Sequence, residues 1–144
     1  MKFIFITIPI TAIVLSQFIF KPIISIIRGR FSVKDMFSYG GMPSSHSALV
    51  SSLSTTIGII RGFDSPEFAI SLFFALIVII DAVGLRGFMS KQGIAINKLI
   101  KDLPDELEYK YEVMNERIAH TISQAIIGVL VGILIPVVIL FYLI

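Results

Sequence analysis

Several kinds of residue are absent or scarce in this sequence, and each shortage removes a class of function. The 144 residues include no cysteine, which excludes disulfides, thiolate nucleophiles and cysteine metal sites. Tryptophan is absent and there are only 2 histidines, so a zinc site would need both imidazoles plus carboxylates, which nothing in the sequence prompts. Only 15% of residues are charged and 56% are hydrophobic, with a mean hydropathy of +0.92. This composition excludes an ordinary soluble domain and indicates a single integral-membrane domain over residues 1–144.

Long uncharged runs predict four membrane-spanning helices. The first covers residues 3–20, about 27 Å of helix, which is enough to cross a bilayer with little tilt. A secretory signal peptide is the alternative there, and we favour a retained span because no small-x-small cleavage site follows Phe20. The other expected spans are residues 44–62, 67–89 and 118–144. We therefore expect an all-α, polytopic membrane helical bundle with about four transmembrane helices.

Two segments are less apolar than the rest. Residues 44–62 are rich in Ser and Thr, which suits an interior helix that packs closely against its neighbours better than a lipid-facing one. The 90–117 loop is polar, and Ile94–Ile100 within it predicts a short amphipathic helix. Asp102–Glu106 predicts the end of that helix and the start of another, with Pro104 in its first turn.

The most distinctive stretch is Gly40–Ala48, which reads Gly-Gly-Met-Pro-Ser-Ser-His-Ser-Ala. Pro43 suits the first position of a helix, which would leave the amides of Ser44, Ser45 and His46 as early donors without intrahelical acceptors. Such amides, together with the helix dipole, favour an anion and above all a phosphate. The alternative is a polar loop that only caps a membrane helix.

Four spans place the 21–43 and 90–117 loops on one membrane face. Of the 12 Lys and Arg residues, only Lys2 and Arg61 fall on the opposite face, so the positive-inside rule predicts that the shared face is cytoplasmic. Five groups able to bind or transfer a phosphate meet there: Lys21, Arg28, His46, Arg86 and His120. The alternative for the cations is that they only snorkel to the headgroup boundary.

Three polar residues near the expected helix ends could support these groups. Asp81 ends an uncharged run, and it is either a functional carboxylate at membrane depth or one half of a structural ion pair. Glu116, His120 and Gln124 are spaced i, i+4, i+8, which predicts that they share one helix face. Two imidazoles, several cations and helix-start amides together indicate phosphoryl transfer through a histidine, which needs no metal.

With these motifs, the chain resembles the divergent bacterial and plant branch of the type 2 phosphatidic acid phosphatase superfamily, which also includes vanadium haloperoxidases. Lys21 and Arg28 have the seven-residue spacing of the superfamily, and residues 40–48 reproduce the branch motif. Residues 81–86 match its Asp-Ala-x-Gly-x-Arg motif, and His120–Thr121 matches a later His-Thr pair.

The resemblance implies a role for each matched residue. His120 would be the nucleophile that forms a phosphohistidine, and His46 would be the general acid for the leaving group. The residues that would hold the phosphate oxygens are Lys21, Arg28, Ser44, Ser45 and Arg86. The resemblance implies no metal or other cofactor.

The sequence departs from the superfamily at three sites, of which Gly29, where a Pro often follows the arginine, is minor. A carboxylate is expected four residues after the nucleophile, where this chain has Gln124. An amide can fix the imidazole tautomer but cannot stabilise the imidazolium, so catalysis would be slower unless Asp81 or Glu116 supplied the charge. The 34-residue separation of Arg86 and His120 is longer than usual, which leaves Arg117 as an alternative to Arg86.

These observations predict a lipid phosphatase in a bacterial cytoplasmic membrane, with its active site facing the cytoplasm. The substrate class is a lipid phosphate monoester or pyrophosphate, such as phosphatidic acid, phosphatidylglycerol phosphate or a polyprenyl phosphate. The alternative is a non-catalytic protein that binds lipid phosphates, and vanadate-dependent halide oxidation is disfavoured in so short and hydrophobic a chain. The expected partners are the lipid phosphate and the bilayer, without nucleic acid, and a homodimer is left open.

Overall fold

The protein folds as a bundle of helices. The computed structural model describes residues 3–27, 29, 41–104, 110–114, 116 and 119–143. In these ranges the elements are α1 (Ile4–Leu15), the π-helix η1 (Ser16–Phe20), α2 (Lys21–Ile27), α4 (Ser45–Arg61), α5 (Pro66–Val83), α6 (Leu85–Lys101) and α8 (Ile122–Leu143). The described residues contain no strand, and the prediction of an all-α membrane bundle is confirmed.

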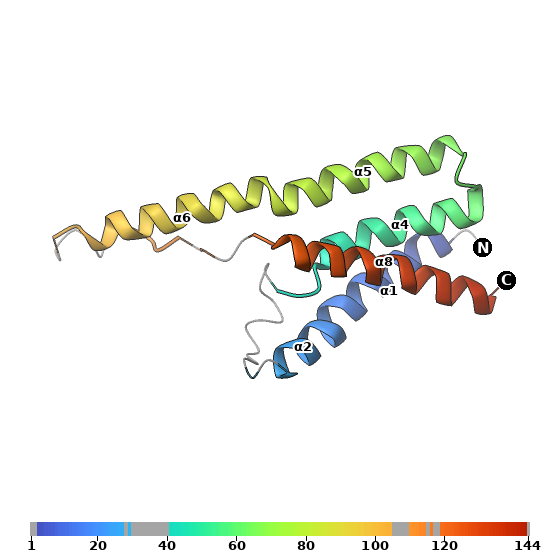
Figure 1. The fold of residues 1–144 in the computed structure, drawn as a ribbon, viewed down its shortest axis with the longest axis horizontal. Helices are drawn as coiled ribbons and strands as arrows, with labels where there is room; N and C mark the ends of the chain where they lie inside the picture. Colours follow the sequence, from blue (N-terminus) through green and yellow to red (C-terminus); the bar gives the residue numbers. More distant parts are fainter. Residues whose placement is uncertain are drawn as a thin grey trace.

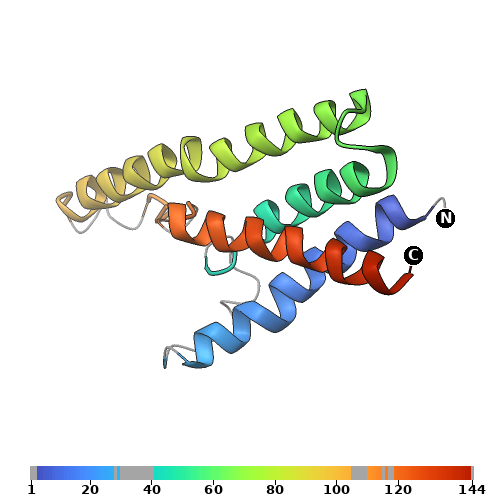
Figure 2. The same cartoon turned by 45° about the vertical axis from the view of Figure 1, so that its right-hand side comes forward.

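Helix α4 lies at the centre of the bundle. It packs against α1, α5 and α8, which contact one another much less (Figures 1 and 2). Both termini lie at one end of the bundle, whereas α2 and α6 run toward the other end (Figure 1). The ends of α2 and α6 therefore lie on the same side of the bundle, as an even number of spans requires.

The polar character of α4 explains its interior position. Among the described residues, three helical segments are long and apolar enough to cross a membrane, namely Ile4–Ile27, Pro66–Lys101 and Ile122–Leu143. Helix α4 is not among them, and most of its Ser and Thr side chains are buried against the neighbouring helices. Thr56 Oγ1 donates to Ser52 O at 2.7 Å, and Ser71 Oγ of α5 donates to Ser54 Oγ at 3.3 Å. These bonds satisfy hydroxyls that would be costly to leave unpaired in lipid.

Two glycines of α8 let it lie directly against the backbone of α4. A Cβ atom at Gly128 would overlap Ser44 O, and one at Gly132 would lie 2.5 Å from Ala48 O. Because the obstructing atoms belong to the backbone, a change of side-chain rotamer could not make room. Small residues four positions apart are the usual means by which membrane helices approach this closely.

Helices α5 and α6 form one rod that is interrupted only at Gly84 (Figure 1). Gly84 N donates to Ile80 O at 2.7 Å and Phe88 N donates to Gly84 O at 3.1 Å, so helical hydrogen bonding continues past the interruption. The boundaries thus differ from those expected, because the span 67–89 and the amphipathic stretch Ile94–Ile100 belong to the same rod. The reason is that no proline or turn sequence separates them.

Two other helices begin later than expected. Helix α4 begins at Ser45 and not at Pro43, because the Ser44 hydroxyl accepts a backbone N–H of the first turn and caps the helix. Helix α8 begins at Ile122, so His120 precedes the helix instead of lying within it. Local side-chain caps, which apolar content does not reveal, determine both starting points.

We expect Gly128→Ala to destabilise the bundle by about 1–3 kcal/mol, because overpacking against a backbone carbonyl must displace a helix. Gly87→Ala is the matched control, since a Cβ there meets nothing within 4 Å and alanine favours a helix. Thermal unfolding in detergent, followed by circular dichroism, measures both variants. Equal melting temperatures for the two variants would contradict the close packing of α8 on α4.

Candidate functional site

The start of α4 is fixed to α8. Ser44 N donates to Gln124 O at 3.0 Å, and Ser44 Oγ accepts from Ser47 N at 3.3 Å and from Ser47 Oγ at 3.0 Å. Ser44 is fully buried and its hydroxyl is occupied by the helix cap. The expectation that the Ser44 amide is an unpaired helix donor was therefore wrong. The amides of Ser45 and His46 are the first two of the helix, where no intrahelical acceptor is available.

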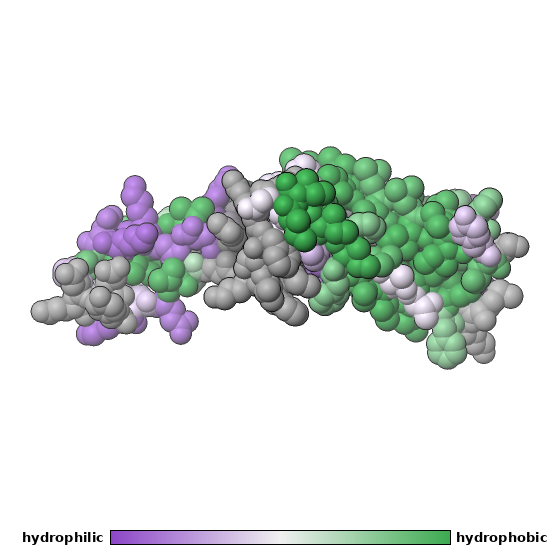
Figure 3. Space-filling view, turned by 90° about the horizontal axis from the view of Figure 1, so that it is seen from below, coloured by the Kyte–Doolittle hydropathy of each residue, from purple (hydrophilic) through white to green (hydrophobic). Residues whose placement is uncertain are grey.

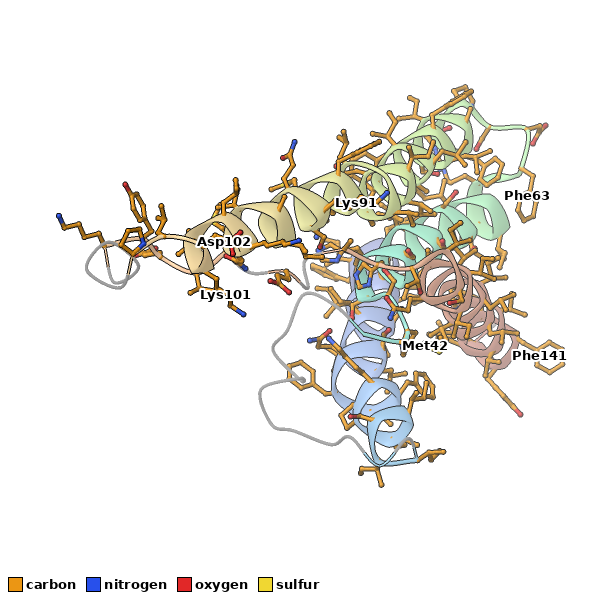
Figure 4. The ribbon with its side chains drawn as sticks, turned by 60° about the vertical axis from the view of Figure 1, so that its left-hand side comes forward. Met42, Phe63, Lys91, Lys101, Asp102 and Phe141 are labelled. Atoms are coloured by element: carbon orange, nitrogen blue, oxygen red, sulfur yellow. The ribbon has the colours of Figure 1, made fainter. Side chains whose placement is uncertain are left out.

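The N-terminal helix brings an amide side chain and a cation to this point. Ser45 Oγ donates to Gln17 Oε1 of η1. Lys21, at the start of α2, is only 5% exposed, and its stem runs along Gly41, where a Cβ would lie 2.6 Å from Lys21 Cε. Gly41 has a φ of 116°, a conformation that favours glycine. In Figure 4 the neighbouring Met42 lies beside α1 and α8, where α4 begins.

The two histidines lie next to each other although 74 residues separate them in the sequence. Their ring centroids are 6.2 Å apart, and the ring planes are inclined at 57°. His46 is in the first turn of α4, whereas the backbone N–H of His120 donates to Ala82 O of α5 at 3.2 Å. His120 is only 4% exposed. Two imidazoles at this separation can both contact a single phosphate group.

Gln124 determines which nitrogen of His120 carries the proton. Gln124 N donates to Thr121 Oγ1 at 3.3 Å, and Thr121 N donates to Gln124 Oε1 at 3.0 Å, which is a capping box at the start of α8. Because the Thr121 N–H needs an acceptor, the oxygen of the Gln124 amide must face it. His120 Nδ1 lies 3.3 Å from the same oxygen and must therefore be the protonated nitrogen of the neutral ring.

The other nitrogen, Nε2 of His120, keeps its lone pair. It is buried and has no hydrogen-bond partner among the residues that the structure describes. Burial lowers the pKa of His120 from its ordinary value of 6.5, and the Gln124 hydrogen bond raises it; the charges of His46, Lys21 and Arg86 lower it further. The ring is therefore neutral near pH 7. A neutral imidazole with a free Nε2 is the protonation state that a nucleophile requires.

The two carboxylates that could have replaced the missing acid are engaged elsewhere. Asp81 Oδ2 accepts from Arg86 Nε at 3.4 Å, and Glu116 Oε1 accepts from Asn97 Nδ2 at 2.8 Å. The helix face that Glu116 was expected to share with His120 does not form, because α8 begins after both residues. The side-chain partner of His120 is therefore the neutral amide of Gln124.

Helix α6 holds the chain segment that returns toward the histidines. Asn97 Oδ1 accepts from Met114 N at 2.7 Å, Asn97 Nδ2 donates to Met114 O at 2.8 Å, and Ser90 Oγ donates to Glu116 O at 2.6 Å. The role of Asn97 was not predicted from the sequence, because no spacing pattern marks this residue. The capping box at 121–124 was not predicted either, although Thr-x-x-Gln is the sequence pattern of such a box.

The structure thus places His46, His120 and Gln124 next to one another, and the charges of Lys21 and Arg86 lower the pKa of His120, with Asp81 beside Arg86. Arg28 and Arg117 lie outside the described residues. In the described ranges no three His, Asp or Glu side chains gather as a metal site would require.

Comparison with known proteins identifies relatives of this chain. A family model described as "Divergent PAP2 family" matches residues 2–135. The "Uncharacterized membrane protein YuiD" of Bacillus subtilis (strain 168) is 43% identical over 93 residues, which are 65% of this chain and 59% of that protein. No solved structure matches the chain. The family model covers all the motifs that carried the resemblance to the divergent branch of the superfamily. The predicted family of the chain is therefore confirmed.

We expect the pKa of His120 to lie below 6.5, and Gln124→Glu to raise it, because a carboxylate stabilises the imidazolium. The imidazole resonances of isotope-labelled histidine in detergent micelles report this titration directly. Since the chain has 2 histidines, His46→Gln leaves a single signal and makes the assignment. A His120 pKa that does not respond to Gln124→Glu would contradict the contact between these side chains.

Proposed function

The chain belongs to the divergent PAP2 family, and from this premise we propose that it is a membrane lipid phosphatase that acts through a phosphohistidine. The observation that supports the proposal most is the state of His120. Its Nδ1 is held by Gln124, its Nε2 has no partner among the described residues, and His46 lies beside it. A buried imidazole in this state is suited to attack phosphorus.

In the first step, the Nε2 lone pair of His120 attacks the phosphorus atom of the lipid phosphate. The bond from phosphorus to the leaving oxygen breaks, and His46, which the negative charge of the bound phosphate keeps protonated, donates its proton to that oxygen. The lipid alcohol leaves, or the shortened lipid phosphate if the substrate is a pyrophosphate. The phosphoryl group is then bonded to His120 Nε2.

In the second step, water attacks the phosphohistidine. His46, now neutral, takes a proton from the water, the bond between nitrogen and phosphorus breaks, and inorganic phosphate leaves. His120 Nε2 recovers its lone pair and His46 its proton. The same two imidazoles therefore complete the cycle without a net change in either residue.

Cations and amides around the histidines would hold the phosphate oxygens. Lys21 and Arg86 lower the pKa of His120 through their positive charge, which would also attract the negative charge of a phosphate. The amides of Ser45 and His46 begin α4 and favour an anion. The Ser44 hydroxyl is occupied by its cap, so we assign Ser44 to positioning α4 and leave the oxygen contacts to its neighbours.

The position of the site favours a lipid substrate. It lies where α4 begins, on the side of the bundle toward which α2 and α6 run, so its phosphate would sit at headgroup level and its tail among apolar helices (Figure 1). Phosphatidic acid, phosphatidylglycerol phosphate and polyprenyl phosphates all meet this description. We place the chain in a bacterial cytoplasmic membrane with this face toward the cytoplasm.

One observation favours a second function, the binding of lipid phosphates without catalysis. The partner of His120 is the neutral Gln124, which fixes the tautomer but gives no charge to stabilise an imidazolium. The same cations would still hold a phosphate headgroup. Turnover distinguishes the two functions.

We expect the purified protein to release phosphate from at least one of these lipids in mixed micelles, with full activity in EDTA and inhibition by vanadate, which mimics a five-coordinate phosphoryl group. His120→Ala should abolish release, and His46→Ala should lower kcat by about 10²–10⁴-fold, the usual contribution of a general acid. Lys101→Ala, an exposed cation at the end of α6, is the matched control and should leave kcat unchanged.

Three results would contradict the phosphatase proposal. Activity that EDTA abolishes and Mg²⁺ or Zn²⁺ restores would replace the histidine nucleophile with a metal mechanism. Wild-type turnover by His120→Ala would exclude His120 as the nucleophile. Tight lipid-phosphate binding without release, with every variant checked by size-exclusion chromatography, would favour the binding protein.

We expect single cysteines at Ser32 and Asp105 to resist an impermeant thiol reagent in intact cells and to react after permeabilisation. The physical reason is the excess of Lys and Arg in the two loops, which favours their retention in the cytoplasm. The natural chain has no cysteine, so the unmodified protein is a clean background. Labelling of both positions in intact cells would reverse the proposed orientation.

A further inference from the structure

The rod formed by α5 and α6 is longer than the bilayer is thick. Its 36 residues correspond to about 54 Å of helix, whereas a bilayer with its headgroups measures about 40–45 Å. Part of α6 must therefore lie in the headgroup layer or beyond it. Figure 3 shows this part as an arm with mixed hydrophilic and hydrophobic atoms, next to an almost continuously hydrophobic body.

An exposed apolar stripe runs along this arm. Its members are each between 39% and 67% exposed, and we call them the α6 stripe: Leu85, Phe88, Met89, Ile96 and Leu99. At 3.6 residues per turn they fall within an arc of about 100°, which is the width of a face that normally packs against something. Glu116 and Met114 of the returning chain do not lie over the stripe, because Ser90 and Asn97, to which they are bonded, are on another side of the helix.

The charges beside the stripe indicate what covers it. Lys91 and Lys98 lie about two turns apart along one edge and are both exposed, and α6 contains no Asp or Glu. Lys91 Nζ lies 6.0 Å from the ring centroid of Phe88, so cation and apolar surface are adjacent (Figure 4). A helix with a basic edge beside an apolar stripe is suited to the boundary between anionic headgroups and acyl chains.

We propose that in the bilayer the rod bends at Gly84, where the helix is already interrupted, so that α6 lies with its stripe against the anionic headgroup layer, on the membrane face that carries the two histidines. The inference does not depend on the phosphatase proposal, because it uses only the length, exposure and charge of α6. A second copy of the chain is the other possible occupant. Two parallel α6 helices would bring Lys91 and Lys98 of both copies together without an acidic residue of α6 to pair with them, so the charges favour lipid.

Two single-cysteine variants on opposite sides of α6 test the proposal. Leu99→Cys is in the stripe, and Ile94→Cys is on the opposite side of the helix, although the two side chains are similarly exposed at 67% and 52%. If α6 projected straight into water, Ile94 would be about 7.5 Å nearer the bilayer than Leu99. If the stripe lies on the membrane, Leu99 is the more deeply placed residue. The two arrangements therefore predict opposite orders of depth for Ile94 and Leu99 relative to the bilayer.

The variants are labelled with an environment-sensitive fluorophore and reconstituted in vesicles of phosphatidylcholine with or without phosphatidylglycerol. We expect the Leu99 label to show the greater blue shift, with stronger quenching by brominated lipid and weaker quenching by aqueous iodide than the Ile94 label. The difference between the two labels in blue shift and in quenching should increase with phosphatidylglycerol and decrease with salt. It should also decrease in the Lys91→Gln/Lys98→Gln double variant.

Other outcomes would overturn the proposal. Greater lipid quenching at Ile94, or equal exposure of both labels to iodide, would mean that α6 projects into water. A Leu99 label that neither quencher reaches, together with a disulfide between two Leu99→Cys chains, would mean that the stripe packs on a second copy. Size-exclusion chromatography in detergent verifies that every variant is folded, and phosphate release is a separate measurement that bears only on the phosphatase proposal.

Discussion

The close approach of α8 to α4 is the contact on which the rest of the structure depends. Gly128 and Gly132 allow the two backbones to meet, and this contact places Ser44 against the first turns of α8. The bond from Ser44 N to Gln124 O can form only at that distance. The start of α4 and the residue that orients His120 are therefore parts of one junction, so packing in the bundle and geometry at the histidines cannot vary independently.

That contact also explains how a polar helix can be central in a membrane protein. Helix α4 buries Ser and Thr along most of its length, and its Ser52 Oγ, like Ser16 Oγ of the neighbouring η1, is buried without a partner among the described residues. Such a helix would be unfavourable in lipid, where no water can satisfy its hydroxyls. The three apolar helices around it are therefore needed to separate its hydroxyls from lipid, and small side chains let these helices pack closely against it.

Hydropathy was sufficient to predict the apolar helices and the face on which the motifs meet, because burial in lipid leaves a strong compositional signal. It could not predict where α8 begins, since the capping box of Thr121 and Gln124 determines that point. The short pattern of that box was visible in the sequence and would have corrected the boundary. The role of Asn97 could not have been predicted, because its bonds go to the backbone of a distant segment, which no local pattern encodes.

The late start of α8 changes how His120 must be held. A residue inside a helix is oriented by the helix, whereas His120 is held by Ala82 O of α5 and by Gln124 of α8, after a return segment that α6 anchors. A carboxylate in place of Gln124 would accept the same hydrogen bonds and would also pair with the cations around the ring. The neutral amide orients the imidazole without adding a negative charge beside it. In the proposed phosphatase, the site would thus give up stabilisation of an imidazolium and keep its positive charge for a phosphate.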